Sequence, residues 1–234
     1  MRVRFRFSKL GKVRWTSHRD LARMWERAFR RVDLRLAYTE GFSPRPKVSF
    51  GLALPTGAES VCEYLDVELA HGEQPDVAAL PGRLSPALPV GIDVLAATVV
   101  EEKGSLQEIV TSCRWEMEAA NAGVDEGSLR DRVAQVLAAD SLFVTRVRKG
   151  QSTTDDIRPA ILSLAVLDTA VLECELATEG RGLRPSELLA AIDPGIEPGR
   201  VLRTHQWIQR DGAKWEPVPL LLPATAAPHA ERAS

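Results

Sequence analysis

Residues 38–51 read Tyr-Thr-Glu-Gly-Phe-Ser-Pro-Arg-Pro-Lys-Val-Ser-Phe-Gly, and the predicted fold is arranged around this stretch. Pro44 and Pro46 fix their own φ at about −65° and push the residues before them towards extended geometry. Gly41, just upstream, permits a positive φ or a close backbone approach. The sequence therefore predicts a stiff loop that leads into a short apolar strand at 48–52.

The stiff loop carries two cations, Arg45 and Lys47. A loop that only connects two strands is more often flexible and polar, so stiffening around two positive charges favours a site for an anion. The alternative is a rigid crossover whose charges simply face solvent. Glu59 and Glu63 are expected to pair with Arg45 or Lys47 and to hold the shape of the loop.

The charge of the chain is strongly segregated. Residues 1–50 contain 14 Lys and Arg against 4 Asp and Glu, a balance of +10, whereas the remainder carries −12. Such segregation is typical of a face that binds a polyanion.

Two elements in the first fifty residues are expected to present this charge. Arg2, Arg4 and Arg6 alternate with apolar residues, which predicts a strand with one basic face. A helix is predicted to follow, with Ser17 as its N-cap. Its basic stripe contains Arg19, Arg23, Arg27 and Arg30. For one helix alone a solvated face is the simpler interpretation, but two basic elements so close together favour binding.

His18 is the strongest single candidate for chemistry. It lies in the first turn of the predicted helix beside Arg14 and Arg19, where the helix dipole and the neighbouring cations favour the neutral imidazole. A neutral imidazole there is suited to act as a general base on a ribose hydroxyl. The alternative is a capping or packing role.

Aromatic residues accompany the basic ones, as single-stranded RNA binding requires. Tyr38 and Phe42 are expected to stack on bases beside Arg45. The predicted RNA or anion site contains Arg4, Arg14, Arg19, Arg23, Tyr38, Phe42, Arg45 and Lys47.

The pattern of elements predicts an α+β fold made of two ferredoxin-like halves with antiparallel sheets. Residues 1–101 read β-α-β-β-α-β, and residues 106–212 repeat this order. Residues 213–234, with their prolines, are expected to form a disordered tail.

Composition excludes several classes of protein. The three cysteines are far apart and give neither a disulfide framework nor a zinc pair, and the chain lacks the Cys triplet that binds an iron–sulfur cluster. No metal site and no cofactor are expected. No apolar run reaches the length of a membrane span and no targeting segment is evident, so a cytoplasmic location is expected.

Residues 12–21, 38–51, 54–60 and 63–66 together resemble the DUF2344 family, whose members are also called radical-SAM-linked proteins. The resemblance implies a domain that occurs alone or joined to a B12-binding radical SAM protein. It implies no established activity.

Taken together, the sequence predicts an RNA-interacting accessory protein that presents an RNA or ribosomal substrate to a B12-binding radical SAM partner on a separate chain. Two alternatives remain open. One is an RNA-cleaving or RNA-modifying enzyme that uses His18, and the other is a protein-interaction module that docks an acidic partner.

Overall fold

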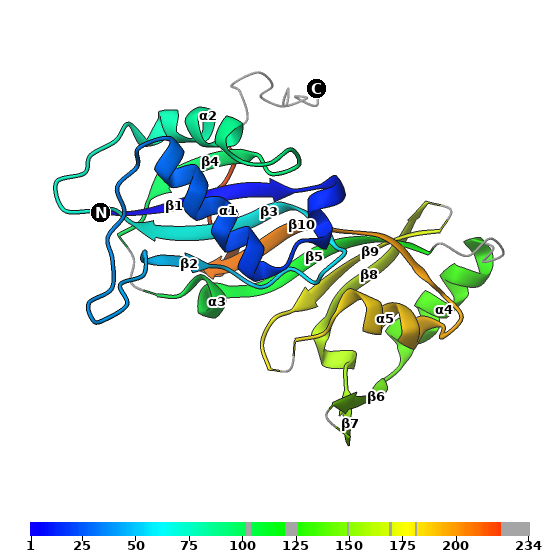
Figure 1. Ribbon diagram of the computed structural model, residues 1–234. Helices are drawn as coiled ribbons and strands as arrows, with labels where there is room; N and C mark the ends of the chain where they lie inside the picture. Colours follow the sequence, from blue (N-terminus) through cyan, green and yellow to red (C-terminus); the bar gives the residue numbers. More distant parts are fainter. Residues whose placement is uncertain (102–103, 120–125, 149, 169, 181, 221–234) are drawn as a thin grey trace, which may run out of the picture.

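The computed structural model describes residues 1–101, 104–119, 126–148, 150–168, 170–180 and 182–220. Its main feature is a nine-stranded sheet in which the strands follow the order β4-β1-β3-β10-β5-β9-β8 (Figure 1). Strand β2 also pairs with β3, and β11 pairs with β10. Helices pack against this sheet, so the predicted α+β class with antiparallel pairing is confirmed.

The first half of the chain has the predicted β-α-β-β-α-β order. Its elements are β1 (Arg2–Lys9), α1 (His18–Arg31), β2 (Val48–Phe50), β3 (Glu59–Glu68), α2 (Leu80–Leu84) and β4 (Val94–Val99), with 3-10 turns at Gly11–Trp15, Val77–Ala79 and Ser85–Ala87. Strand β1 pairs antiparallel with both β3 and β4, and β2 pairs antiparallel with β3.

The second half adds a hairpin that the sequence pattern did not predict in full. Its elements are α3 (Leu106–Ile109), β5 (Val110–Ala119), α4 (Glu126–Ala138), β6 (Phe143–Arg148), β7 (Gln151–Asp156), β8 (Ile161–Asp168), β9 (Val171–Ala177), α5 (Pro185–Ile192), β10 (Pro198–Arg210) and β11 (Ala213–Trp215), with a 3-10 turn at Arg158–Ala160. Strands β6 and β7 form a separate two-stranded sheet. The sequence does not predict strand β7, because its residues, Gln-Ser-Thr-Thr-Asp-Asp, have no apolar alternation.

The two halves meet inside one sheet. Strand β10 of the second half pairs with β3 of the first over only two positions, and this is the parallel ladder in the sheet. Because the halves share a sheet and the second carries the extra hairpin, the description as tandem ferredoxin-like units stays an interpretation.

Helix α1 forms because local signals and packing agree. The Ser17 side chain accepts a hydrogen bond from the Asp20 backbone N–H at 3.2 Å, which caps the helix as predicted. Leu21, Trp25 and Phe29 are buried at helical spacing against the sheet. Trp25 packs edge-on against Phe7 of β1, with ring centroids 5.1 Å apart. This packing leaves the arginine side of α1 facing solvent.

Each half has its own hydrophobic core. One cluster joins β1, β3, α1 and α2, and the other joins β5, β8, β9, α4 and α5. A small third cluster contains Cys62, Tyr64, Leu106 and Val218, and it packs the C-terminal segment onto the first half.

The expected basic face of β1 is wrong for Arg4 and Arg6. Both side chains are buried, each residue with 3% of its surface exposed. Arg4 donates to the Asp66 carboxylate at 2.7 and 3.0 Å, and Arg6 donates to the Glu216 carboxylate at 2.6 Å. Strand β1 lies inside the sheet and is covered on this side, so its arginines serve as internal ion pairs.

The predicted disordered tail is wrong at its start. Residues 213–215 form β11 against β10, and Val218 is buried with 3% exposed. The remainder of that prediction, residues 221–234, lies outside the described residues. Within the described part of the chain, no helix is long and apolar enough to cross a membrane.

Replacement of Gly91 should be among the more destabilising changes at a glycine. Gly91 has a φ of +95°, and a Cβ there would lie 2.3 Å from the Leu10 carbonyl oxygen, which is backbone and cannot move aside cheaply. Gly72 has a φ of +79° but open space around it, so it is a matched control. We expect Gly72→Ala to lower the free energy of unfolding by about 1 kcal/mol and Gly91→Ala to lower it by roughly 3 kcal/mol or more. Chemical denaturation of the two variants measures the difference, and equal losses would contradict the close approach.

Candidate nucleic-acid interface

Residues 38–46 form a loop that projects from the first half, here named the 38–46 loop. A bridge between Tyr38 and Pro46 closes its base, and the Thr39 N–H donates to the Arg45 carbonyl at 2.9 Å. The Thr39 hydroxyl accepts from the Arg45 N–H at 3.0 Å. Phe42 at the tip is fully exposed. Figure 1 shows this segment between α1 and β2, standing out from the body of the protein.

The stiffness of the loop stays a prediction that rests on Gly41, Pro44 and Pro46. Gly41 has a φ of +122°, a conformation that L side chains rarely adopt. Pro44 and Pro46 lie on either side of Arg45, which is exposed. Among the described residues, the Arg45 side chain has no hydrogen-bond or ion-pair partner, so its guanidinium is free to meet a ligand.

Lys47 differs from Arg45. Its ammonium lies 2.8 Å from the Glu68 carboxylate, and the hydrogen bond with this carboxylate raises the pKa of Lys47. Both partners are well exposed, so the pair contributes little to stability. Of the two loop cations predicted from the sequence, Lys47 is engaged and Arg45 is available.

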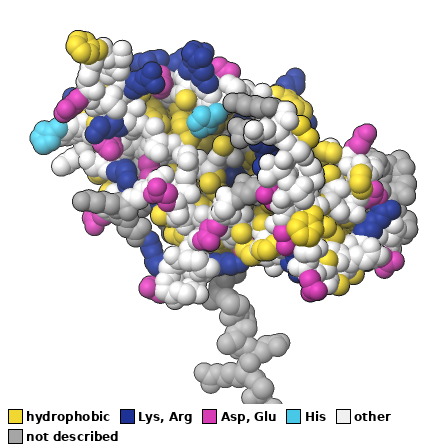
Figure 2. All heavy atoms as spheres, turned by 90° about the horizontal axis from the view of Figure 1, so that it is seen from below, with side chains coloured by type: hydrophobic (Ala, Val, Ile, Leu, Met, Phe, Trp, Pro, Cys, Tyr) yellow, Lys and Arg dark blue, Asp and Glu magenta, His cyan; other side chains and the backbone are white. Residues whose placement is uncertain are grey.

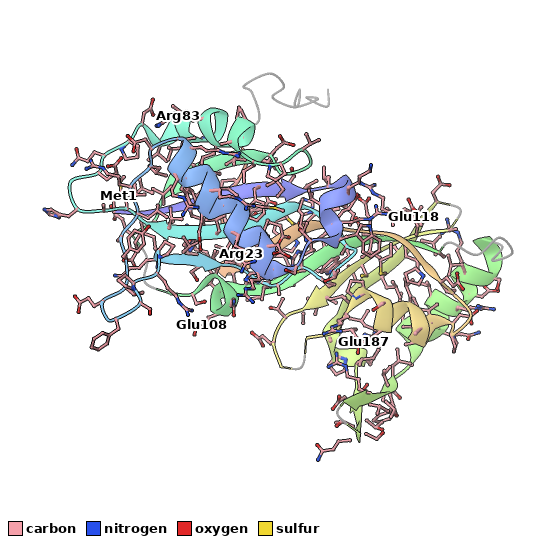
Figure 3. The ribbon with its side chains drawn as sticks, in the orientation of Figure 1. Met1, Arg23, Arg83, Glu108, Glu118 and Glu187 are labelled. Atoms are coloured by element: carbon pink, nitrogen blue, oxygen red, sulfur yellow. The ribbon has the colours of Figure 1, made fainter. Side chains whose placement is uncertain are left out.

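The arginine stripe of α1 faces solvent as predicted. Arg19, Arg23, Arg27 and Arg30 are all exposed. Arg23 makes a 3.6 Å contact with Asp20, and both side chains are more than half exposed, so water still competes for this pair. Figure 3 labels Arg23 on α1, in front of the sheet. In Figure 2, Lys and Arg side chains gather at the upper left, on the side of the first half.

A cavity of about 520 Å³ connects the stripe to the loop. Phe29 and Arg30 of α1 line it from one side, and Arg35, Tyr38 and Pro46 line it from the other. Tyr38 keeps 54% of its surface exposed at this position. The arrangement places an aromatic ring, two arginines and two acids, Glu26 and Asp33, around a space that can receive a planar base.

Arg14 is held mainly by protein contacts. Its guanidinium donates to the Glu59 carboxylate at 3.3 Å and lies 5.3 Å from the ring centroid of Trp15, which is 63% exposed. We therefore place Arg14 at the edge of the interface.

His18 begins α1, as predicted, and is exposed. Its ring packs edge-on against Phe50, with centroids 4.9 Å apart. A small cavity of about 20 Å³ also joins it to Lys9 and Glu63. Among the described residues no side chain donates to the imidazole or accepts from it, so nothing orients the ring as a general base.

The expected partners of Glu59 and Glu63 are wrong. Glu59 accepts from Arg200 at 2.7 Å and from the Gly11 N–H at 2.7 Å. Burial alone raises the pKa of Glu59, but these donors together with Arg14 lower it below its ordinary value. Glu63 accepts from Arg203 at 2.6 and 3.0 Å. Both acids join the two halves, because their main partners lie about 140 positions away on β10.

Acidic side chains on the sheet of the second half have basic partners. Glu116 and Glu173 face each other across β5 and β9, Arg114 lies 4.0 Å from Glu173, and Lys214 forms an ion pair with Glu175. Glu118, labelled in Figure 3, lies near the end of β5.

The three cysteines are buried and free. Burial raises the pKa of the Cys62, Cys113 and Cys174 thiols, which keeps them protonated and unreactive. In the part of the chain that the structure describes, no group of three His, Cys, Asp or Glu side chains is placed to hold a metal.

These features define an α+β protein with an exposed arginine helix beside a proline-containing, aromatic-tipped loop. A family model described as "Uncharacterized protein conserved in bacteria (DUF2344)" matches residues 2–185, so the chain belongs to the DUF2344 family. This confirms the resemblance found in the sequence.

Two further comparisons add little about function. No functionally curated protein matches the chain. A chain of the solved structure titled "Crystal Structure of a Cbf5-Nop10-Gar1 Complex" is similar at 11% identity with a TM-score of 0.43. The similarity covers 87% of this chain and 48% of that chain, so this protein spans about half the length of its structural neighbour. A likeness this remote gives no information on activity or partners.

Proposed function

We propose that this protein binds single-stranded RNA through α1 and the 38–46 loop. The observation that carries the proposal is the cavity at which Arg30, the last arginine of the stripe, meets Tyr38 at the base of the loop. Arginines along α1 supply contacts to phosphates, and Tyr38 and Phe42 supply stacking surfaces for unpaired bases.

The aromatic groups favour single strands over duplexes. Bases in a duplex are already stacked and present only their edges, whereas a fully exposed Phe42 needs a free base face to cover it. Binding of this kind depends little on sequence and strongly on salt.

The proposed role is that of an accessory protein, which presents an RNA or ribosomal substrate to a B12-binding radical SAM protein on a separate chain. The support for this partner is the resemblance of residues 12–66 to radical-SAM-linked proteins. The enzyme alternative is weaker, because His18 has no orienting partner among the described residues. A competition experiment distinguishes RNA binding from docking of an acidic protein. In it, polyglutamate is added to the protein–RNA complex as a mimic of an acidic protein surface.

The loop provides the first test. We expect Arg45→Ala to weaken RNA binding by roughly 1–3 kcal/mol, because its free guanidinium can make a charge-assisted contact with phosphate. Lys47→Ala is the matched control and should have a smaller effect, since its ammonium is paired with Glu68. Pro44→Ala combined with Pro46→Ala should weaken binding with little change in melting temperature, because the prolines order the loop before binding.

Fluorescence anisotropy with labelled single-stranded RNA and a thermal melt of the same proteins measure both quantities. A stable Arg45→Ala variant with wild-type affinity would show that the loop is only scaffold. A large fall in melting temperature in the proline variant would lead to the same conclusion.

A further inference from the structure

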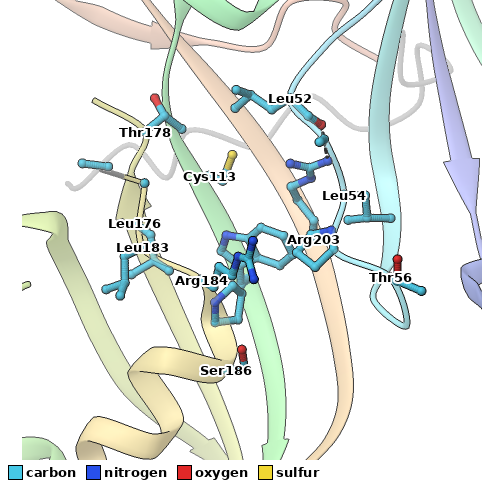
Figure 4. Close-up of a pocket in the computed structure, with 16 residues that line it drawn as sticks. Leu52, Leu54, Thr56, Cys113, Leu176, Thr178, Leu183, Arg184, Ser186 and Arg203 are labelled. Carbon is cyan, nitrogen blue, oxygen red and sulfur yellow. Dashed lines mark hydrogen bonds between the residues drawn. The ribbon is translucent and has the colours of Figure 1, made fainter. Parts of the chain in front are cut away.

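A second cavity, of about 650 Å³, lies where the two halves meet and is here named the junction cleft. Residues 52–56, which follow β2, form one wall, and the other wall comes from β5, β9 and the start of α5 (Figure 4). Its volume falls within the roughly 300–1,000 Å³ that small-molecule sites occupy, and such sites often lie between domains. The cleft shares no lining residue with the cavity at α1.

The walls of the junction cleft combine apolar and polar surface in nearly equal parts. Leu52 and Leu54 line it from the first half, and Trp115, Leu176 and Leu183 line it from the second. The hydroxyls of Thr56, Thr178 and Ser186 are the neutral polar groups of the side chains around it. Among its lining residues no Asp or Glu occurs, whereas two arginines do.

Arg203 forms a rigid floor. It has 1% of its surface exposed and donates from Nε and Nη2 to Glu63, and from Nη2 to the Leu52 carbonyl at 2.9 Å. Its guanidinium also lies 5.1 Å from the ring centroid of Trp115. Because the Glu63 carboxylate neutralises it and three contacts fix it, Arg203 shapes the cleft without adding net charge.

Arg184 is the uncompensated cation. It is exposed, and in the described part of the chain its guanidinium has no ion-pair partner. The nearest acid along the helix, Glu187, is taken by Arg146 and by the Arg184 backbone N–H at 3.0 Å. Figure 4 shows Arg184 reaching into the cleft from the start of α5, with Ser186 beyond it and Arg203 on β10 opposite.

We propose that the junction cleft binds a small organic anion, a carboxylate or a phosphate monoester attached to an apolar body. The anionic group would meet the Arg184 guanidinium and the Ser186 hydroxyl, and the body would cover Leu54, Leu176 and Leu183. The absence of acids from the lining excludes cationic ligands on electrostatic grounds. The leucines beside the unpaired cation favour organic over inorganic anions, because an inorganic anion has no apolar part to bury.

Isothermal titration with a matched set of probes tests this site. The probes are phenylacetate, phenyl phosphate, neutral phenylacetamide and acetate. We expect the first two to bind, phenylacetamide to bind about 10-fold more weakly, and acetate to show no binding. The relative affinity of phenylacetate and phenyl phosphate identifies the preferred anion.

Variants locate the binding. Arg184→Gln should remove the preference for phenylacetate over phenylacetamide and leave RNA affinity unchanged. Arg30→Gln should leave that preference unchanged and lower RNA affinity. The indole N–H resonance of Trp115, assigned with Trp115→Phe, should shift on titration with phenylacetate. Equal binding of the acid and the amide, an unchanged Arg184→Gln variant, or no heat with any probe would each overturn the proposal. None of these results depends on whether the protein binds RNA.

Discussion

Glu63→Ala is expected to destabilise the protein by roughly 3–5 kcal/mol, more than the loss of any exposed ion pair in this protein. The replacement leaves the Arg203 guanidinium, 1% exposed, without its carboxylate partner. A lone buried charge loses its hydration and gains nothing in return, so the native state is penalised directly. Urea denaturation of wild type and variant measures the loss.

The control for this change is Glu68→Ala, which removes the carboxylate of an exposed pair with Lys47 and should lower the stability far less than Glu63→Ala does. The double variant Glu63→Leu with Arg203→Met should recover most of the stability, because it removes both charges together. A Glu63→Ala variant as stable as Glu68→Ala would contradict the view that this pair holds the halves together.

Elements with a strong periodic pattern could be predicted from the sequence with good boundaries. The short strand predicted at 48–52 is β2 at Val48–Phe50, and the Ser17 cap of α1 is as expected. Strand β7 could not be predicted, since a polar edge hairpin has no apolar period to detect. The same holds for β11, whose position depends on pairing with β10 rather than on its own sequence.

For the site, exposure of some side chains could be predicted from the sequence and burial of others could not. Exposure of the α1 arginines follows from the helical stripe, and exposure of Phe42 follows from its place in a proline-rich loop. Burial of Arg6, which donates to the Val218 carbonyl, does not, because alternation in a strand shows only that its two faces differ in chemistry. Whether the polar face meets water depends on what covers the sheet, here the segment around Val218.

The partners in long-range ion pairs could not be predicted from the sequence either. Strand β10 contains three arginines, Arg200, Arg203 and Arg210, and the sequence does not show that Arg203 is the buried one that needs an acid to match it. The sequence alone could not identify Glu63 as that acid, because the partners are separated by 140 positions.

Replacement of the four α1 arginines is expected to have the largest effect on function. Arg19, Arg23, Arg27 and Arg30, each changed to Gln, should weaken binding of single-stranded RNA roughly 100-fold or more. Each lost phosphate contact should also reduce the slope of log affinity against log salt by about 0.7. The four side chains are exposed, so stability should change little.

The most direct test of the central claim is the affinity of this quadruple variant for single-stranded RNA, measured over a range of salt concentrations beside wild type. A variant in the second half, Arg184→Gln with Arg210→Gln, shows whether any loss depends on position as well as charge. We predict that the RNA affinity of wild type and of the second-half variant falls steeply with salt. The α1 variant should bind RNA weakly, with an affinity that changes little with salt. Equal affinity of all three proteins, or wild-type affinity that does not change with salt, would contradict RNA binding at α1.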